Sequence, residues 1–324
     1  MNSLLEEVRA RLFAQEQIDK ETALQLVLID EQEELYMLAD EVRRHFMGNY
    51  FDLCSIINAK SGNCTENCRF CAQSARYHTG IDTYAIAPEA EVMMIAEDND
   101  QHGVHRLSLV TSGRTLTAET VEELSRLYGK MGASTELLFC ASCGLLNDES
   151  TRELKKAGVM RCHCNLGYFP SVCSTHTWEE KVATLNMARR HGLSLCSGGI
   201  IGMDESMKDR LDMAFELREL GVKSIPVNIF TPIAGTPLAN LSPLPLAEVL
   251  TTVALFRLIN PEAVIRMAGG RQQLGDEQYR CFTSGANGAI VGNFLTTGGT
   301  GIQKDLEHLA ALGFTFLRNA KHAN

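Results

Sequence analysis

The sequence predicts a (β/α)8 TIM barrel of the α/β class, preceded by a helical extension. Eight short, β-rich apolar segments alternate with segments in which apolar residues recur every three or four positions. No two strand-like segments follow each other directly, which favours parallel βα units over hairpins. The length of 324 residues suits one such barrel, and no linker or low-complexity run divides the chain. A doubly wound open sheet is the alternative architecture.

The barrel elements can be placed along the chain from these patterns. The predicted strands are residues 53–60, 106–113, 136–144, 161–167, 194–202, 224–232, 263–270 and 288–294. The clearest predicted helices are residues 117–132, 148–158, 177–192, 206–221 and 245–260. Four of them are expected to end at a glycine C-cap, at Gly132, Gly158, Gly192 and Gly221. We expect residues 1–47 to form the helical extension, packed on a barrel of residues 48–324.

Composition and charge narrow the possible functions. The formal net charge of −10, without any Lys/Arg run, argues against binding to nucleic acid. There is no charge-free apolar run of about 18 residues, so we expect no membrane span. The first residues are acidic from Glu6 onward and lack an apolar signal-peptide core, so we expect a cytoplasmic protein. In that compartment the eleven cysteines are expected to be ligands, nucleophiles or core residues, not disulfides.

The motif Cys64-Thr-Glu-Asn-Cys68-Arg-Phe-Cys71 follows the first predicted strand. In a barrel it would lie on a loop at the C-terminal face, where active sites are built. A structural zinc site wants four ligands, usually two separated pairs. A four-iron cluster can take three protein thiolates and leave one iron open. The spacing therefore favours a cluster with an open corner, against zinc ligands completed by a distant residue or unliganded loop cysteines.

Further cysteines indicate a second metal site inside the barrel. They fall on or just after predicted strands, at Cys140, Cys143, Cys162, Cys164 and Cys196. Strand alternation would put Cys162 and Cys164 on one inward face and point His163 away from it, into the core or behind the ligands. Singly, each could be a small core residue. Together with Arg266, a charged group in mid-strand that needs an anion beside it, they favour a metal site. The remaining cysteines, Cys54, Cys173 and Cys281, are assigned to packing or loops.

The motif, with an aromatic Phe70 before its last cysteine, resembles the signature of radical S-adenosylmethionine (SAM) enzymes. That resemblance implies that Cys64, Cys68 and Cys71 hold a 4Fe–4S cluster whose open iron chelates SAM. It also implies reductive cleavage of SAM to a 5′-deoxyadenosyl radical, which removes hydrogen from an unactivated C–H bond. A low-potential donor of the flavodoxin or ferredoxin type would supply the electron.

Beyond the motif, the chain resembles the biotin synthase family over most of its length. The stretches FCAQSARY, LCSGGIIG, SIPVNIFTPIAGTPL and VIRMAGGRQQ carry this resemblance. It implies a homodimeric (β/α)8 barrel that inserts sulfur into dethiobiotin to form biotin. The sulfur would come from an auxiliary iron–sulfur cluster deep in the barrel.

In the common form of the family this auxiliary cluster is 2Fe–2S, held by three cysteines and an arginine. The resemblance places Cys140, Cys196 and Arg266 on three of those positions, but Ser108 stands at the fourth, where a cysteine is expected. We therefore expect a remodelled auxiliary site that holds a four-iron cluster. Its predicted ligands are Cys140, Cys164 and Cys196, with Cys143 and Arg266 as further candidates.

Asn165 and Asn228 match family asparagines that bind the cofactor ribose or the ureido ring of dethiobiotin. An amide offers a donor and an acceptor, which suits a neutral ureido group, but a buried amide satisfied by backbone is the alternative. At position 167 the family often has an acidic residue, but this chain has Gly167. The contact to the cofactor ribose that the resemblance implies would therefore lack that acidic side chain. Gly198 and Gly199 are expected to allow close approach of the cofactor, or simply to form a tight strand end.

Other functions remain open at this level. A hydrogenase-maturase-like or methylornithine-synthase-like radical barrel would share the motif but would not need the inner thiols or the IPVN stretch. A non-catalytic iron–sulfur carrier should expose its labile cluster, whereas these thiols are predicted inside a barrel. A structural zinc protein would need a fourth ligand that the motif does not supply.

Overall fold

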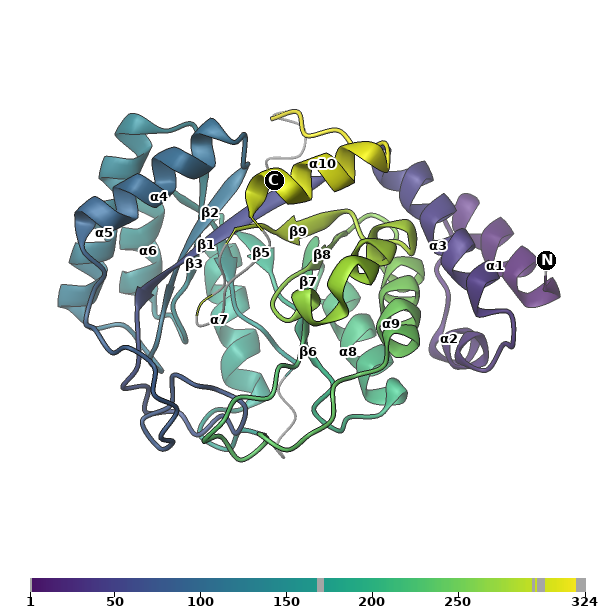
Figure 1. The fold of residues 1–324 in the computed structure, drawn as a ribbon, viewed down its shortest axis with the longest axis horizontal. Helices are drawn as coiled ribbons and strands as arrows, with labels where there is room; N and C mark the ends of the chain where they lie inside the picture. Colours follow the sequence, from purple (N-terminus) through teal and green to yellow (C-terminus); the bar gives the residue numbers. More distant parts are fainter. Residues whose placement is uncertain (1, 168–171, 293–294, 296–300, 319–324) are drawn as a thin grey trace.

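The computed structural model describes residues 2–167, 172–292, 295 and 301–318. Within them, nine parallel strands form one sheet in the order β5-β4-β3-β2-β1-β9-β8-β7-β6, and an additional β5–β7 pairing closes it into a barrel. Helices surround the barrel (Figure 1). This confirms the predicted (β/α)8 fold over the open-sheet alternative.

The element bounds follow the predicted alternation closely. The strands are β1 Asp52–Lys60, β2 Arg106–Thr111, β3 Leu138–Ser142, β4 Val159–His163, β5 Ser194–Cys196, β6 Gly199–Ile201, β7 Ser224–Ile229, β8 Val264–Met267 and β9 Gly288–Ile290. The helices are α1 Ser3–Phe13, α2 Lys20–Val27, α3 Gln32–Met47, α4 Glu89–Gln101, α5 Ala118–Ser134, α6 Asp148–Lys156, α7 Trp178–Arg190, α8 Met207–Glu219, α9 Leu246–Ile259, the 3-10 helix η1 Arg271–Thr283 and α10 Ile302–Ala311. Positions 293–294 of the last predicted strand lie outside the described residues.

The predicted strand 194–202 is interrupted and forms β5 and β6. Both pieces keep the same register on β7, with Cys196 opposite Ser224 and Gly199 opposite Val227. The gap faces Pro226, which has no N–H to donate to a strand ladder. A Cβ on Gly198 would lie 2.0 Å from the Pro226 carbonyl oxygen, so only glycine fits here.

Three of the four predicted glycine caps are confirmed. Gly158, Gly192 and Gly221 follow their helices with positive φ angles of 101°, 71° and 64°. The prediction for Gly132 is wrong, because α5 continues to Ser134. Gly132 instead lies inside that helix, where a Cβ would come within 3.3 Å of the Phe139 ring.

Helices α1–α3 precede the first strand, and α2 and α3 pack on α8 and α9 while α1 packs on α3 (Figure 1). Tyr36 of α3 anchors them, since its hydroxyl donates to the Ala247 carbonyl at 3.2 Å and lies 3.0 Å from Thr251 Oγ1. Among the described residues, no helix has the length and apolar character needed to cross a membrane.

Candidate functional site

A cavity of about 350 Å³ lies within the barrel and reaches the loops that follow the strands. The three motif cysteines, Cys64, Cys68 and Cys71, line it. Its wall also carries four cysteines from strands and strand ends: Cys54, Cys140, Cys164 and Cys196. The motif thiols and three of the predicted inner thiols, Cys140, Cys164 and Cys196, therefore face one cavity, whose size is typical of a ligand site.

The motif loop is fixed by its own backbone. Cys64 donates its N–H to the Gln73 carbonyl at 3.0 Å and accepts from Ala75 N at 2.9 Å. A tight turn closes the other end, where Cys71 N donates to the Cys68 carbonyl at 3.0 Å. Burial raises the pKa of the Cys71 thiol to about 11 and also raises the pKa of Cys68. Ligation as thiolates would therefore require a positive partner such as iron.

The inner part of the cavity brings together thiols from β1, β3 and β5. Cys54 hydrogen-bonds to Cys140, and this bond, helped by nearby arginines, lowers the pKa of Cys140 to about 6 against the effect of burial. On β5, Cys196 Sγ lies 3.3 Å from His163 Nδ1 and accepts from Ser224 Oγ at 3.4 Å. Burial lowers the pKa of His163 to about 4, so its imidazole is neutral near pH 7.

Buried arginines give this inner region an excess of positive charge. Arg266 Nη2 lies 2.9 Å from Asp52 Oδ1, and Arg106 Nε lies 3.8 Å from Asp52 Oδ2. Arg161 lines the cavity from β4. Burial opposes ionisation of Asp52, but Arg266, Arg161 and Arg106 outweigh it and lower its pKa to about 2. Three guanidinium groups exceed the negative charges of the Asp52 carboxylate and the Cys140 thiolate together, which leaves room for an anionic occupant.

Ser108 supports the presence of a bound group in the same region. It lies opposite Cys140 in the β2–β3 register, lines the cavity and is 4% exposed. Its hydroxyl has no hydrogen-bond partner among the described residues. A buried hydroxyl without a partner is costly, so the chemistry of this wall fits an iron–sulfur group better than an empty core.

The prediction that Cys162 and Cys164 share an inward face is wrong, because β4 ends at His163. Arg161 and His163 take the inward positions, and Cys162 packs in the hydrophobic core outside the cavity lining. Cys164 follows the strand and still lines the cavity. There its thiol interacts electrostatically with the buried ammonium group of Lys181.

Two other cysteines lie where the sequence did not predict them. Cys143, a candidate ligand, packs in the hydrophobic core, and its thiol hydrogen-bonds to the Thr111 side chain. Cys54, assigned to packing, instead lines the cavity beside Cys140. For Cys54, the only sequence signal of a place in the site is its position near the start of the first strand. For Arg106 and Arg161, the signal is that each is a charged residue within an apolar strand.

Both predicted asparagines line the cavity, and both also bond to backbone. Asn165 Oδ1 accepts from Gly198 N at 3.1 Å. Asn228 donates from Nδ2 to the Gly199 carbonyl at 3.0 Å and accepts from Gly269 N at 3.1 Å. Each amide keeps further hydrogen-bonding capacity for a ligand. Gly167 forms an isolated β-bridge with Gly199. A Cβ on Gly167 would come within 2.7 Å of the Gly199 Cα, so this close packing leaves no space for an acidic side chain at position 167.

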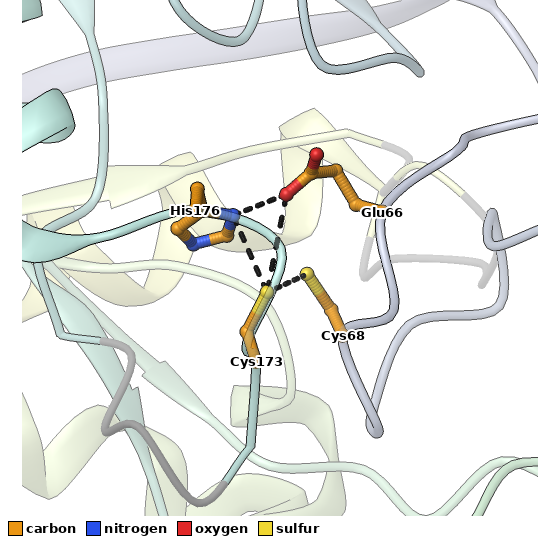
Figure 2. Close-up of side chains that lie close together, drawn as sticks. All are labelled: Glu66, Cys68, Cys173 and His176. Atoms are coloured by element: carbon orange, nitrogen blue, oxygen red, sulfur yellow. Dashed lines mark hydrogen bonds and ion pairs between the residues drawn. The ribbon is translucent and has the colours of Figure 1, made fainter.

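Four side chains gather beside the motif loop, as Figure 2 shows: Glu66, Cys68, Cys173 and His176. Their ligand atoms all lie within 4.8 Å of one another. The sequence assigns Cys173 to packing or a loop, and the residue does lie in the loop between β4 and α7. Nothing in the sequence links residue 173 to residue 68. Only the fold brings the two segments together.

A closed (β/α)8 barrel with a three-thiol loop defines the class of radical SAM enzymes, and residues 59–231 match the radical SAM superfamily. Residues 226–315 match the Biotin and Thiamin Synthesis associated domain. The chain belongs to the biotin synthase family. The biotin synthase of Desulfotalea psychrophila is 50% identical, covering 87% of this chain and 85% of that protein. Biotin synthase 2 of Corynebacterium diphtheriae is 46% identical over 98% of both chains.

Solved structures share the fold at much lower identity. The crystal structure of methylornithine synthase superposes with a TM-score of 0.82 at 19% identity, covering 98% of both chains. The FeFe-hydrogenase maturase from Carboxydothermus hydrogenoformans gives 0.79 at 16% identity, covering 96% of this chain and 78% of that one. These likenesses show the barrel alone, and the curated relatives favour biotin synthase over both alternatives.

Proposed function

We propose that this chain is the enzyme that inserts sulfur into dethiobiotin to form biotin. One cavity that holds the motif thiols together with an inner group of thiols and arginines carries this proposal. Family membership supplies the cofactors: a 4Fe–4S cluster, SAM and an auxiliary iron–sulfur cluster. When bound, the 4Fe–4S cluster and SAM together supply the chemistry that abstracts hydrogen, and the auxiliary cluster supplies sulfur.

For the catalytic cluster, we propose Cys64, Cys68 and Cys71 as ligands. The loop that carries them follows β1 and lies at the C-terminal ends of the strands. Their common exposure to the cavity supports this assignment. The barrel wall would exclude water from the reacting carbon atoms, and Asn165 and Asn228 would orient the ureido group or the cofactor ribose.

For the auxiliary cluster, we propose Cys54, Cys140 and Cys196 as thiolate ligands and a four-iron type. This revises the predicted set, because Cys54 contacts Cys140 while Cys164 interacts with Lys181. Arg266 is held by Asp52 and Ser224, so it would balance charge and would not need to ligate iron. His163 lies beside Cys196 and would hydrogen-bond to its thiolate.

The wider setting of the enzyme is also a proposal. We propose a homodimer in the cytoplasm, reduced by a flavodoxin or ferredoxin type of donor, with residues 1–47 as a helical extension on the barrel. The family resemblance supports the dimer and the donor. Eleven unpaired thiols support a reducing compartment.

The decisive experiment is an anaerobic incubation of the reconstituted protein with SAM and a low-potential reductant, with and without dethiobiotin. Biotin and 5′-deoxyadenosine are read by mass spectrometry. We expect biotin with about two deoxyadenosines per product, since two C–H bonds are replaced. Deoxyadenosine without biotin would leave the radical chemistry in place and overturn dethiobiotin as the substrate.

A further inference from the structure

The side chains Glu66, Cys68, Cys173 and His176, which we call the mouth cluster, come from two segments far apart in the sequence (Figure 2). Glu66 and Cys68 belong to the motif loop, whereas Cys173 and His176 lie between β4 and α7. All are buried or nearly so. This donor set of two thiols, an imidazole and a carboxylate is typical of a zinc or ferrous ion.

The spacing of the donor atoms fits one metal ion. Bonds of about 2.0–2.3 Å to a tetrahedral ion give donor–donor edges of about 3.3–3.8 Å. Cys173 Sγ lies 3.4 Å from Cys68 Sγ, 3.3 Å from His176 Nδ1 and 3.9 Å from Glu66 Oε2. The thiol–thiol, thiol–imidazole and thiol–carboxylate edges therefore come close to those of a tetrahedral site. Glu66 Oε2 and His176 Nδ1 are hydrogen-bonded to each other, and that contact would open on metal binding.

The two segments are held together by contacts that do not involve the donor atoms of the thiols. Arg69 N donates to the Val172 carbonyl at 2.8 Å, and Ser174 N donates to Asn67 Oδ1 at 3.0 Å. Asn67 N donates to Thr175 Oγ1 at 3.1 Å. The mouth cluster is therefore preorganised by backbone and polar side-chain contacts, which lowers the entropic cost of binding an ion.

Groups around the mouth cluster orient and balance its ligands. Arg114 Nη1 lies 3.2 Å from Glu66 Oε1, and Thr175 Oγ1 donates to Glu66 Oε2 at 2.8 Å. These contacts orient the carboxylate with Oε2 toward the thiol of Cys173. A ligating carboxylate held by an outer partner is usual in metal sites. Lys181, whose ammonium donates to the Asn165 carbonyl at 2.7 Å, interacts electrostatically with both Cys68 and Cys173. These cations would offset the charge of two thiolates and a carboxylate.

We propose that the mouth cluster binds a single divalent cation, Zn²⁺ or Fe²⁺, when the catalytic cluster is not assembled. Binding would release the thiol protons to solvent and change no oxidation state. The inference rests on the proposed function in one respect, since Cys68 is also a proposed ligand of the 4Fe–4S cluster. The ion and that cluster therefore compete for Cys68, and the ion occupies the loop only until the cluster is built.

The first test is a titration of the full-length, iron-free and reduced chain with Co²⁺, followed by optical absorption. We expect thiolate-to-cobalt charge-transfer bands and intense tetrahedral d–d bands, both reversed by Zn²⁺. Cys173→Ser and His176→Gln should each weaken binding at least tenfold. Cys162→Ala and Cys281→Ala are the matched controls and should keep the bands, because both residues pack in the core and neither lines the cavity or belongs to the mouth cluster. Bands unchanged in both Cys173→Ser and His176→Gln would overturn the site.

The second test concerns the competition for Cys68. The zinc-loaded chain is supplied with iron and sulfide, and zinc release is followed with a chelating dye while the reduced 4Fe–4S cluster is followed by electron paramagnetic resonance. We expect cluster formation to track zinc release in the wild type and to be unaffected by zinc in Cys173→Ser. A complete catalytic cluster with zinc retained would overturn the competition. Neither result depends on biotin formation by the zinc-free holoenzyme, so this inference and the proposed function fail separately.

Discussion

At the scale of single residues, the side of the strand that a cysteine occupies decides its chemistry. Cys140 faces the cavity among arginines, whereas Cys143, just beyond β3, packs in the core beside Thr111. The two residues carry the same thiol group and lie only three positions apart in the sequence. Burial raises the pKa of Cys143 to about 12, while the pKa of Cys140 falls to about 6. What distinguishes the candidate ligand Cys140 from the packing residue Cys143 is therefore whether the side chain points into the cavity or into the core.

This difference predicts the outcome of single cysteine replacements. Cys54→Ser should lose the auxiliary cluster, so that iron falls from about eight to about four atoms per chain. Cys164→Ser and Cys143→Ala should keep about eight, because neither is in the proposed ligand set. Iron and sulfide analysis with Mössbauer spectroscopy checks the counts. Loss of the auxiliary cluster in Cys164→Ser, with retention in Cys54→Ser, would restore the ligand set predicted from the sequence.

Two glycines offer a matched pair for stability. A Cβ on Gly198 would lie 2.0 Å from a backbone oxygen of Pro226, so Gly198→Ala should destabilise the chain by about 1–3 kcal/mol. Gly129 is exposed in the middle of α5, with nothing within 4 Å of its missing Cβ. Gly129→Ala should therefore stabilise by about 0.5–1 kcal/mol. Urea unfolding of the cluster-free chains measures the free energy of unfolding of both variants. If both substitutions changed it in the same direction and by the same amount, the packing argument would be contradicted.

At the scale of elements, the sequence predicted what depends on local pattern and missed what depends on neighbours. The alternation of strands and helices, and the caps at Gly158, Gly192 and Gly221, follow from periodicity and glycine geometry, and the structure confirms them. The break between β5 and β6 depends on Pro226 of the adjacent strand. The contact between Cys68 and Cys173 depends on how two loops meet, and no local pattern encodes it.

A buried ion pair between described residues helps to attach helix α10 to η1. Asp305 of α10 pairs with Arg271 of η1, and Tyr279 donates to Asp305 Oδ1 at 3.0 Å. Asp305→Asn would leave a buried guanidinium without its counter-charge, so we expect a loss of about 3–5 kcal/mol and faster hydrogen exchange in α10. Asp276→Asn, which removes an exposed pair with Lys304, should cost no more than about 1 kcal/mol. A similar cost for both variants would show that α10 does not depend on the buried pair.

At the scale of the whole molecule, the barrel closes where the proposed auxiliary site lies. A single register pair, Cys196 opposite Ser224, joins β5 to β7. Ser224 Oγ donates to Cys196 Sγ at 3.4 Å and accepts from Arg266 at 3.4 Å. The closure of the sheet and the environment of the auxiliary thiols are thus parts of one structure. An occupant that ligates Cys196 would also stabilise this junction of β5 and β7, which we call the seam.

Removal of the clusters should therefore loosen the barrel locally at this seam. The amide of Ser197 donates to the Ser224 carbonyl at 3.0 Å, so this amide reports the opening of the seam. The amide of Cys164 donates to the Cys196 carbonyl at 3.0 Å and reports the adjacent contact between β4 and β5. In hydrogen exchange of cluster-loaded and cluster-free protein, we expect the largest loss of protection in residues 194–201 and 224–229. The β1–β2 and β2–β3 pairs have longer registers and should change least. Cys143→Ala, which removes a core thiol outside the cavity, should leave this pattern intact. If protection were lost evenly around the barrel, or first in β1 and β2, the auxiliary cluster could not be what holds the sheet closed.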